Sequence, residues 1–455
     1  MSSPQDDFPE AHKICQIFRL SEEQMFQIVD RLTAEIELGL ARDTHSRSTV
    51  KSFVTHVQNL PTGKERGKYL VLELGDATVS VLLVYIKSET DIEMTSKTFE
   101  LSKNLKHGSG NRLFQFFAKC LAEFCHELNI AMENLPLSFV FSFPCEQEAV
   151  DIGVLLNWKS GFNSSDVEGK NVTKLLQNAI NRRTDIRVNV VAMLTGTTGS
   201  LLSLAFSKQN CFIGIIVGST TNASYVEKTL NTQMLQGYET SLKDNMIINT
   251  EWGTFGENGE LDFIRTDYDI AVDKLTSDQM RNIFEKCVSG IYLGEIVRQI
   301  LLDLMDKQLI FKGQKSNAIR EPWTFDTRYM LQIEAEMPGQ YRATDMVLHR
   351  LGITTNNQKD LACVRYVCNI IAKRSAMLMA CGLVSLIKKM DVSEISVAVD
   401  GGIYRFHPTY HDMIMANVNL LLKDSATVEL VLSEKGTALG AAFVAASSIC
   451  KCRGE

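Results

Sequence analysis

The stretch from Val188 to Phe206 carries residue types that could bind an anion but none that could accept a proton. An apolar strand pattern runs into the turn from Thr195 to Ser200, and apolar residues at helical spacing follow it. Free backbone N–H groups and the positive end of the helix dipole collect at such a helix N-terminus. The pattern is typical of an anion-binding turn, and equally of an ordinary helix start capped by threonine or serine. Neither alternative supplies a general base.

Two further turns repeat one design about 140 residues apart. Residues 69–86 form two β-rich runs around Gly75 and Asp76, which predicts a hairpin with a tight turn. Residues 211–227 form two similar runs around Gly218 and Ser219. The repetition suggests a duplicated domain in which each unit presents a turn to one shared cleft. Two unrelated hairpins are the alternative.

The elements that must position these turns alternate between helices and strands, which predicts an α/β chain. Ser21 and Gln24 form an N-terminal helix signature ahead of a long amphipathic pattern. Helices are predicted over residues 20–40, 111–128, 166–182, 279–304, 323–336, 344–351, 361–389 and 436–449. Further strands are predicted over residues 94–101, 137–143, 246–252, 395–399 and 427–432. Gly440 in the last helix predicts close approach of another backbone.

Composition argues against several classes of protein, among them nucleic-acid-binding, disulfide-rich and membrane proteins. The chain has 455 residues, a net charge of −7 and 45% hydrophobic residues, so large cores and two or three domains are expected. The acidic balance argues against a nucleic-acid partner. Eleven scattered cysteines with no CxxC pair predict reduced thiols rather than disulfides or a zinc site. The N-terminus lacks the pattern of a signal peptide and no apolar run reaches bilayer length, so a cytoplasmic protein is expected.

Four blocks of sequence carry a resemblance to the eukaryotic hexokinase family. They run from Phe141 to Cys145, Ile248 to Leu261, Gly290 to Arg298 and Val399 to Pro408. The resemblance extends from about residue 20 to 449 and matches the family members of single-unit size, about 50 kDa. It implies two α/β domains of the actin-like, ribonuclease-H-like type with an interdomain cleft. It also implies ATP-dependent phosphorylation of a hexose at its 6-hydroxyl, the entry to glycolysis.

Four segments follow from this organisation. Residues 1–19 are expected to be a mobile tail, and residues 20–67 a helix and linker packed on the large domain. Residues 68–194 are expected to form the small domain, to which the helix at 436–455 returns. Residues 195–435 are expected to form the large domain.

The sugar-binding positions of the family are largely kept. The resemblance places sugar contacts at Ser142, Phe143, Pro144, Asn222, Glu251 and Glu285. Carboxylates and amides suit a polyhydroxylated ring, because each buried hydroxyl needs a partner. For Glu251 a solvated strand end is the alternative. The family's Thr-Lys pair is replaced by Lys159-Ser160, so the lysine comes one position earlier.

The catalytic position departs from the family pattern. Where the family has Asn-Asp, this chain has Thr195-Gly196. The resemblance assigns that aspartate the role of general base, which takes the proton from the attacking sugar hydroxyl. Glycine cannot accept a proton, and loss of a positioned base typically costs about 10²- to 10⁴-fold in rate.

The phosphate turns depart as well. Asp76 replaces a glycine of the family, and a carboxylate within about 4 Å of a phosphate charge costs roughly 1 to 4 kcal/mol. Glu73 replaces the family's aspartate and could still serve Mg²⁺. By resemblance, the nucleotide and phosphate positions are Gly75, Asp76, Thr197, Gly218, Ser219, Asp400, Gly401 and Thr437.

We therefore expect a hexokinase-family protein that binds a glucose-like hexose but has weakened Mg-ATP binding and little or no kinase activity. Neither a nucleic acid, nor a membrane, nor a metal site intrinsic to the fold is expected. Two alternatives stay open. One is an active hexokinase in which Asp76, Glu251 or a water replaces the base. The other is an interaction protein that binds neither ligand.

Overall fold

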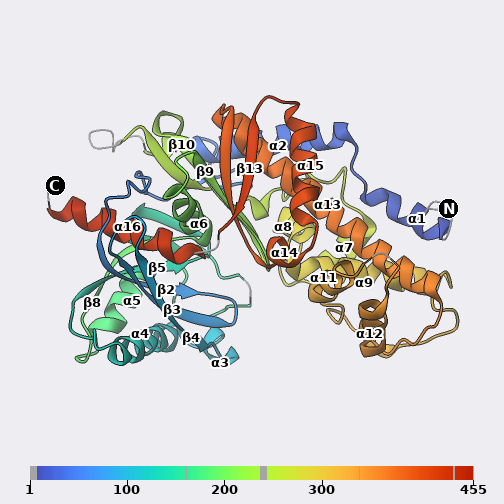
Figure 1. The fold of residues 1–455 in the computed structure, drawn as a ribbon, viewed down its shortest axis with the longest axis horizontal. Coiled ribbons are helices and arrows are strands. Elements are labelled where there is room, and N and C mark those ends of the chain that lie inside the picture. Colours follow the sequence, from blue (N-terminus) through green and yellow to red (C-terminus); the bar gives the residue numbers. More distant parts are fainter. Residues whose placement is uncertain (1–7, 160, 236–242, 338, 434–435, 454–455) are drawn as a thin grey trace.

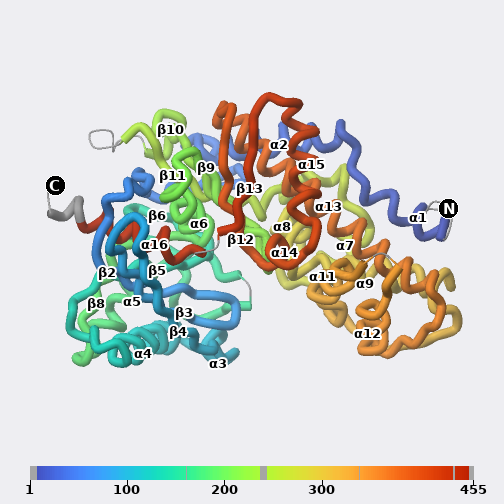
Figure 2. Tube along the Cα trace, viewed as in Figure 1, coloured from blue at the N-terminus to red at the C-terminus, as the bar shows by residue number. Residues whose placement is uncertain are grey.

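The computed structural model describes residues 8–159, 161–235, 243–337, 339–433 and 436–453. Two lobes lie side by side, each built around one β-sheet (Figure 1). The small lobe contains a five-stranded sheet and the large lobe a six-stranded sheet. The chain trace in Figure 2 shows the N-terminal helix on the large lobe and the C-terminal helix returning to the small lobe.

The small lobe places helices on both faces of its sheet. Leu70 and Leu72 face a core shared with α4 and α5, whereas Tyr69 and Val71 face a core shared with α16. A two-stranded sheet, β6–β7, lies beside them. The elements are β2 (Gly67–Leu74), β3 (Thr78–Ile86), β4 (Ile92–Glu100), α3 (Lys103–Lys106), α4 (Gly110–Glu127), β5 (Leu135–Phe141), β6 (Cys145–Ala149), β7 (Ile152–Leu155), α5 (Val172–Asn181), β8 (Val188–Leu194) and α16 (Gly436–Arg453).

The large lobe follows the same plan around a larger core. α6 packs on one face of its sheet, and Ile213, Ile215 and Val217 of β9 join the core on the other face. The sheet and its neighbours are α1 (Pro9–Cys15), α2 (Glu22–Leu40), β1 (Phe53–Val54), α6 (Gly196–Ala205), β9 (Cys211–Val217), β10 (Thr221–Lys228), β11 (Asn245–Asn249), β12 (Glu394–Asp400) and β13 (Thr427–Leu432). The remaining α-helices are α7 (Asp267–Lys274), α8 (Ile283–Val288), α9 (Gly290–Asp306), α10 (Asn317–Arg320), α11 (Thr327–Glu334), α12 (Arg342–Arg350), α13 (Gln358–Met390), α14 (Gly402–Phe406) and α15 (Tyr410–Leu422). Short 3₁₀ helices are η2 (Gln16–Phe18), η3 (Thr229–Asn231), η4 (Gln233–Leu235) and η5 (Trp252–Thr254).

Strand order supports the predicted duplication. The small-lobe order is β4-β3-β2-β5-β8, and five strands of the large lobe have the order β11-β10-β9-β12-β13. In both, the first three strands are antiparallel and the last two join in parallel. The two hairpins predicted around Gly75 and Gly218 therefore occupy equivalent places in two equivalent sheets.

Helices α6 and α16 pack together between the two sheets and contribute to one shared core. They approach closely where Gly199 faces Gly440, since a Cβ on Gly440 would lie 2.0 Å from the carbonyl oxygen of Gly199. The close approach predicted at Gly440 is confirmed. Because it brings the start of α16 against the start of α6, Thr437 lies beside Gly196.

The central helix of the large lobe is α13. Among the described residues it is the one helix long and apolar enough to cross a membrane by length and composition, whereas the sequence analysis expected no such segment. Its packing accounts for this composition, because 89% of the apolar stretch is buried in the lobe. Arg374, within this stretch, is paired with Asp269 at 2.6 Å.

Several sequence predictions need correction. The helix predicted over residues 323–336 covers only Thr327–Glu334, and the one predicted over 279–304 is two helices, Ile283–Val288 and Gly290–Asp306. Within the expected mobile tail, Pro9–Cys15 forms a helix and Gln16–Phe18 a 3₁₀ helix, and Cys15 and Phe18 are buried against the large lobe; residues 1–7 lie outside the described part. The helix predicted over residues 166–182 covers only Val172–Asn181. Asp166 and Gly169 adopt positive φ angles of 62° and 73°, which a right-handed helix excludes. The predicted domain limits at 67/68, 194/195 and 435/436 lie at the start of β2, between β8 and α6, and before α16.

Candidate active site

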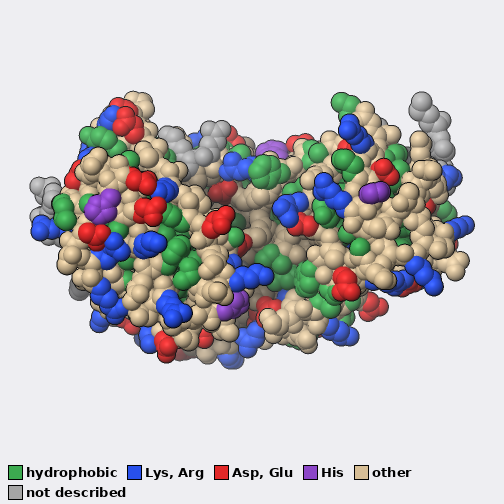
Figure 3. All heavy atoms as spheres, turned by 90° about the horizontal axis from the view of Figure 1, so that it is seen from below, with side chains coloured by type: hydrophobic (Ala, Val, Ile, Leu, Met, Phe, Trp, Pro, Cys, Tyr) green, Lys and Arg blue, Asp and Glu red, His purple; other side chains and the backbone are tan. Residues whose placement is uncertain are grey.

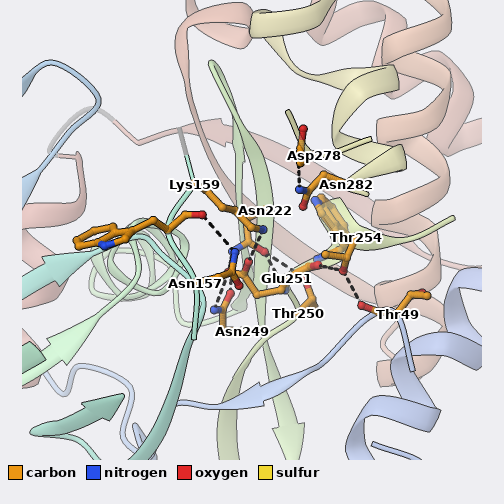
Figure 4. Close-up of polar contacts among 12 residues, drawn as sticks. Thr49, Asn157, Lys159, Asn222, Asn249, Thr250, Glu251, Thr254, Asp278 and Asn282 are labelled. Atoms are coloured by element: carbon orange, nitrogen blue, oxygen red, sulfur yellow. Dashed lines mark hydrogen bonds and ion pairs between the residues drawn. The ribbon is translucent and has the colours of Figure 1, made fainter. Parts of the chain in front are cut away.

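Glu251 is the centre of a polar cluster at the end of β11 (Figure 4). Its Oε1 accepts hydrogen bonds from the amides of Asn222 (2.8 Å) and Asn249 (3.1 Å). Asn222 Oδ1 accepts in return from the backbone N–H of Glu251 at 3.1 Å. Glu251 has a left-handed backbone, φ 54°, which these bonds hold in place. It is therefore buried and fixed, rather than a solvated strand end.

Lys159 reaches Glu251 from the other lobe. Its Nζ lies 3.4 Å from Glu251 Oε2, and both side chains are largely buried. Burial lowers the pKa of Lys159, but the negative charges of Glu251 and Glu285 outweigh this effect and leave the pKa raised. The earlier position of the lysine thus still directs its ammonium into the cluster. Ser160 lies outside the described residues.

Glu285, in α8, is the second buried carboxylate. Burial raises its pKa to about 7; Lys159 opposes the shift and Glu251 adds to it. The chain at Gly253 passes close to it, since a Cβ there would lie 3.2 Å from Glu285 Oε2. Together, two carboxylates, two amides and one ammonium present both acceptors and donors, which suits a ligand rich in hydroxyls.

Ser142 links the small lobe to the start of α6. Its Oγ accepts a hydrogen bond from the backbone N–H of Gly196 at 3.0 Å, and its side chain is exposed. The neighbouring Phe143 and Pro144 are buried. Phe143 packs edge-on against Trp158, with ring centroids 4.9 Å apart. Phe143 thereby supports the segment that carries Lys159, and its ring belongs to the core of the small lobe.

The turn before α6 contains a closed ring of four hydroxyl groups. Thr195 Oγ1 contacts those of Thr197 (3.0 Å) and Thr198 (3.2 Å). Ser224 Oγ contacts the same two at 2.7 and 3.0 Å. Thr197 was predicted to bind phosphate, but its hydroxyl is only 1% exposed and is used inside this ring. The prediction that the Thr197 hydroxyl donates into the cleft is therefore wrong, because this hydroxyl is bonded to Thr195 and Ser224.

Gly196 is surrounded by apolar and hydroxyl groups. A Cβ built on it would lie 2.9 Å from Ile216 Cδ1, 3.3 Å from Thr437 Cγ2 and 3.4 Å from Ser142 Oγ. None of these three nearest atoms belongs to a carboxylate. The space beside the turn is thus filled by a neighbouring isoleucine rather than by a proton acceptor.

The first phosphate turn connects β2 and β3. The N–H of Gly75 donates to the carbonyl of Thr78 at 2.9 Å, and Asp76 is exposed at the tip. Glu73 Oε1 accepts a hydrogen bond from Thr437 Oγ1 at 2.8 Å. Burial raises the pKa of Glu73, and the charge of Asp400 adds to this, whereas the bond from Thr437 opposes it. Glu73 thus joins the start of α16 to the end of β2.

The second phosphate turn faces the start of α9. The N–H of Gly290 donates to the carbonyl of Gly218 at 2.7 Å, and the N–H of Ile291 donates to that of Ser219 at 3.3 Å. Gly401 has φ 114°, and a Cβ there would lie 2.3 Å from the carbonyl oxygen of Val217. Asp400 Oδ1 accepts from the backbone N–H of Gly401 at 2.7 Å. A cavity of about 330 Å³ between Gly218, Thr327 and Gly402 opens beside this turn.

Several residues of the cleft were not predicted. Asn249 lies two positions before Glu251. Its place at the polar end of a strand could have indicated that its side chain belongs to the same site. Trp158, Asn282, Tyr292 and Trp323 line a larger cavity of about 780 Å³ that also contacts Lys159 and Glu285. Nothing in their spacing marks them as neighbours. Figure 3 shows acidic and basic side chains on both sides of the hollow between the lobes.

Two family models cover most of the chain. The hexokinase models match residues 10–206 and 212–447. The chain belongs to the hexokinase family. Hexokinase type 1 of Drosophila melanogaster is 36% identical over 443 residues, which cover 97% of this chain and 95% of that protein. Hexokinase-1 of Rattus norvegicus is 37% identical over 448 residues, 96% of this chain but 48% of that protein.

The chain thus spans about half the length of the mammalian hexokinases it matches and nearly all of the fly enzyme. A solved hexokinase from Schistosoma mansoni, complexed with glucose, superposes with a TM-score of 0.91 at 34% identity, over 98% of this chain and 100% of that one. A second hexokinase structure gives a TM-score of 0.79 at 26% identity and covers 98% of this chain and 99% of that one. The predicted two-domain, actin-like hexokinase fold is confirmed.

Proposed function

We propose that this protein is a cytoplasmic, hexose-binding member of the hexokinase family in which phosphoryl transfer is impaired. The observation that carries the proposal is Gly196. At the position that the family resemblance assigns to the general base, the three nearest neighbours are a methyl group of Ile216, a methyl group of Thr437 and the Ser142 hydroxyl. None of these three described neighbours is a carboxylate that could accept the proton of a hydroxyl nucleophile.

Hexose binding is supported by the cluster around Glu251. A pyranose ring needs donors and acceptors for each hydroxyl that it buries. Lys159, Asn222, Glu251 and Glu285 supply both kinds within one buried site. The schistosome hexokinase, whose structure contains glucose, has the same fold.

Weakened Mg-ATP binding is supported by the phosphate turns. Mg²⁺ in kinases is usually held by one or two carboxylates together with substrate phosphates. Glu73 could take that place, but Thr437 already donates to it, and Asp76, exposed at the tip of the same turn, repels a phosphate that approaches there. Among the described residues, no group of three or more His, Cys, Asp or Glu side chains could hold a metal without the nucleotide.

A coupled hexokinase assay and calorimetric glucose titration on the same preparation test the proposal. We expect heat from glucose binding and no glucose-dependent ADP above a buffer blank. Turnover within tenfold of an ordinary hexokinase would refute impaired transfer, and absence of glucose binding would refute the sugar site. If turnover is found, Asp76→Asn and Glu251→Gln variants identify which carboxylate replaces the base.

A further inference from the structure

The cavity beside Glu285 is larger than one hexose requires. It measures about 780 Å³ and is lined from the small lobe by residues near Lys159 and from the large lobe by residues near Asn282 and Trp323. At the ~30 Å³ that a liquid water occupies, roughly 26 waters would fill it, about twice the number of heavy atoms in a hexose. A sugar ring at Glu285 therefore leaves room for a second group of similar size.

Trp323 forms an aromatic wall of this extra space. Its side chain is 40% exposed, and its backbone is left-handed, φ 65°, which is unfavourable for a bulky residue. The strained position is held by the buried Glu295, whose Oε2 accepts from the Trp323 N–H at 2.7 Å. The indole packs edge-on against Tyr292, with centroids 6.2 Å apart. Non-glycine residues fixed in this way occur preferentially at ligand sites.

Asn282 lies in the same cavity wall. Its backbone is also left-handed, φ 51°, and its N–H donates to Glu257 Oε1 at 2.8 Å. Its Nδ2 donates to Asp278 at 2.8 Å, which turns Oδ1 the other way. That Oδ1 is buried and has no hydrogen-bond donor among the described residues. Because Oδ1 is shielded from solvent, Asn282 shapes the cavity wall without offering that oxygen to a ligand.

We propose that the cleft binds a hexose that carries a second ring, an aryl or glycosyl group. The first ring lies at Glu251 and Glu285, so the inference rests on the proposed sugar site. The second ring stacks on Trp323 and lies against Asn282. Of the charged side chains that line the cavity, Lys159 is paired with Glu251, and Asp278 with Lys286 at 3.2 Å; Arg281 also lines it, so the titrations include a charged glucuronide.

Calorimetric titration of the full chain with glucose, methyl glucosides and phenyl glucosides of both anomers tests this proposal. We expect at least one phenyl glucoside to bind about tenfold more tightly than its methyl counterpart, because aromatic stacking adds to area burial. Trp323→Gly should remove this ratio and leave glucose affinity unchanged. Glycine tolerates the left-handed backbone, so the variant should fold. Trp323→Phe, the matched control, should keep most of the ratio.

Equal affinity for phenyl and methyl glucosides in the native protein would overturn the proposal. So would a Trp323→Gly variant that weakens glucose and both glucosides alike. Tighter binding of a glucuronide than of the phenyl glucosides would also overturn it, in favour of a charge site at Arg281. Phenyl glucoside binding without glucose binding would refute the simple hexose site and still support the second-ring site. Binding of none of them would refute both.

Discussion

Gly196 contributes to the site through its backbone alone. Its N–H donates to Ser142 Oγ, which ties the start of α6 to the small lobe. The absent side chain leaves a space that Ile216 Cδ1 approaches, at 2.9 Å from a built Cβ. An aspartate introduced here would press on the end of a flexible side chain rather than on backbone. A shorter residue at 216 should relieve that contact.

Restoring the base is the most direct residue-level test. We expect Thr195→Asn and Gly196→Asp, combined with Ile216→Val, to raise kcat by about 10²- to 10⁴-fold if the phosphate turns are competent. The control variant replaces Gly196→Asp by Gly196→Asn and keeps the other two substitutions. Its side chain at 196 has nearly the same shape but no proton acceptor, so kcat should not rise. Steady-state kinetics of the two proteins separates the base from the rest of the site. No gain in either would place the defect in the phosphate turns.

Glu285 should make stability depend on pH. Its folded-state pKa of about 7 lies above its ordinary 4.5, so the stability linked to the neutral carboxyl is present below pH 4.5 and lost as pH rises through about 7. We expect Glu285→Gln to raise the free energy of unfolding at pH 8 by up to ~3 kcal/mol and to change it little at pH 4.5. Urea unfolding at both pH values measures this. The control is Glu148→Gln, at an exposed position. An equal change in the free energy of unfolding at both pH values for Glu285→Gln would contradict the expectation.

Among the elements, the helices α6 and α16 position the residues around Gly196. Their glycines allow a backbone contact that brings Thr437 within reach of Glu73 and Gly196. The ring of hydroxyls joins α6 to β10 through Ser224. Two helices and two strands are therefore fixed to one another by contacts that surround the site.

Gly440→Ala should disturb this contact. Its Cβ would lie 2.0 Å from the carbonyl oxygen of Gly199, which is backbone and cannot rotate away. We expect a loss of about 1–3 kcal/mol in stability, typical of overpacking, and weaker glucose binding. The matched control is Gly402→Ala, whose Cβ would meet only Phe406 Cδ2 at 3.9 Å. Equal melting temperatures for the two variants would show that the helix crossing is not tight.

At the scale of the whole molecule, the ion pair between Lys159 and Glu251 joins the lobes across the cleft. Lys159 also lowers the pKa of Glu285. In this cluster one ammonium lies between two carboxylates, those of Glu251 and Glu285. The contact between the lobes and the charge of the cluster are therefore coupled.

The substitution Lys159→Met tests whether the contact between the lobes and the charge of the cluster are coupled. Without the ammonium, the pKa of Glu285 rises further, so the pH at which glucose affinity falls to half should move upward by comparison with the native protein. Loss of the pair should also open the lobes, seen as a larger radius of gyration in small-angle scattering. Lys159→Arg keeps the charge and should leave both measurements near native. An unchanged pH profile in Lys159→Met would contradict the role of the lysine.

Local sequence patterns predicted most of the elements and the repeat of the strand pairs. Strand–glycine–strand patterns at 69–86 and 211–227, the capping box at Ser21 and Gln24, and the small residues near Gly440 depend on local spacing, and the structure confirms each. The start of the chain was missed because α1 is short and acquires its order by burying Cys15 and Phe18 in the large lobe.

Which side chains are in contact could be seen only in the tertiary structure. Lys159 and Glu251 are 92 residues apart in sequence, and the hydroxyls of Thr197 and Ser224 are brought together by packing of α6 on β10. The filling of the space beside Gly196 by Ile216 likewise follows from the approach of α6 to β9. Such contacts depend on strand order and lobe packing, which local periodicity does not encode. The sequence therefore shows that residue 196 has no side chain to accept a proton, and only the fold shows that Ile216 is its nearest neighbour.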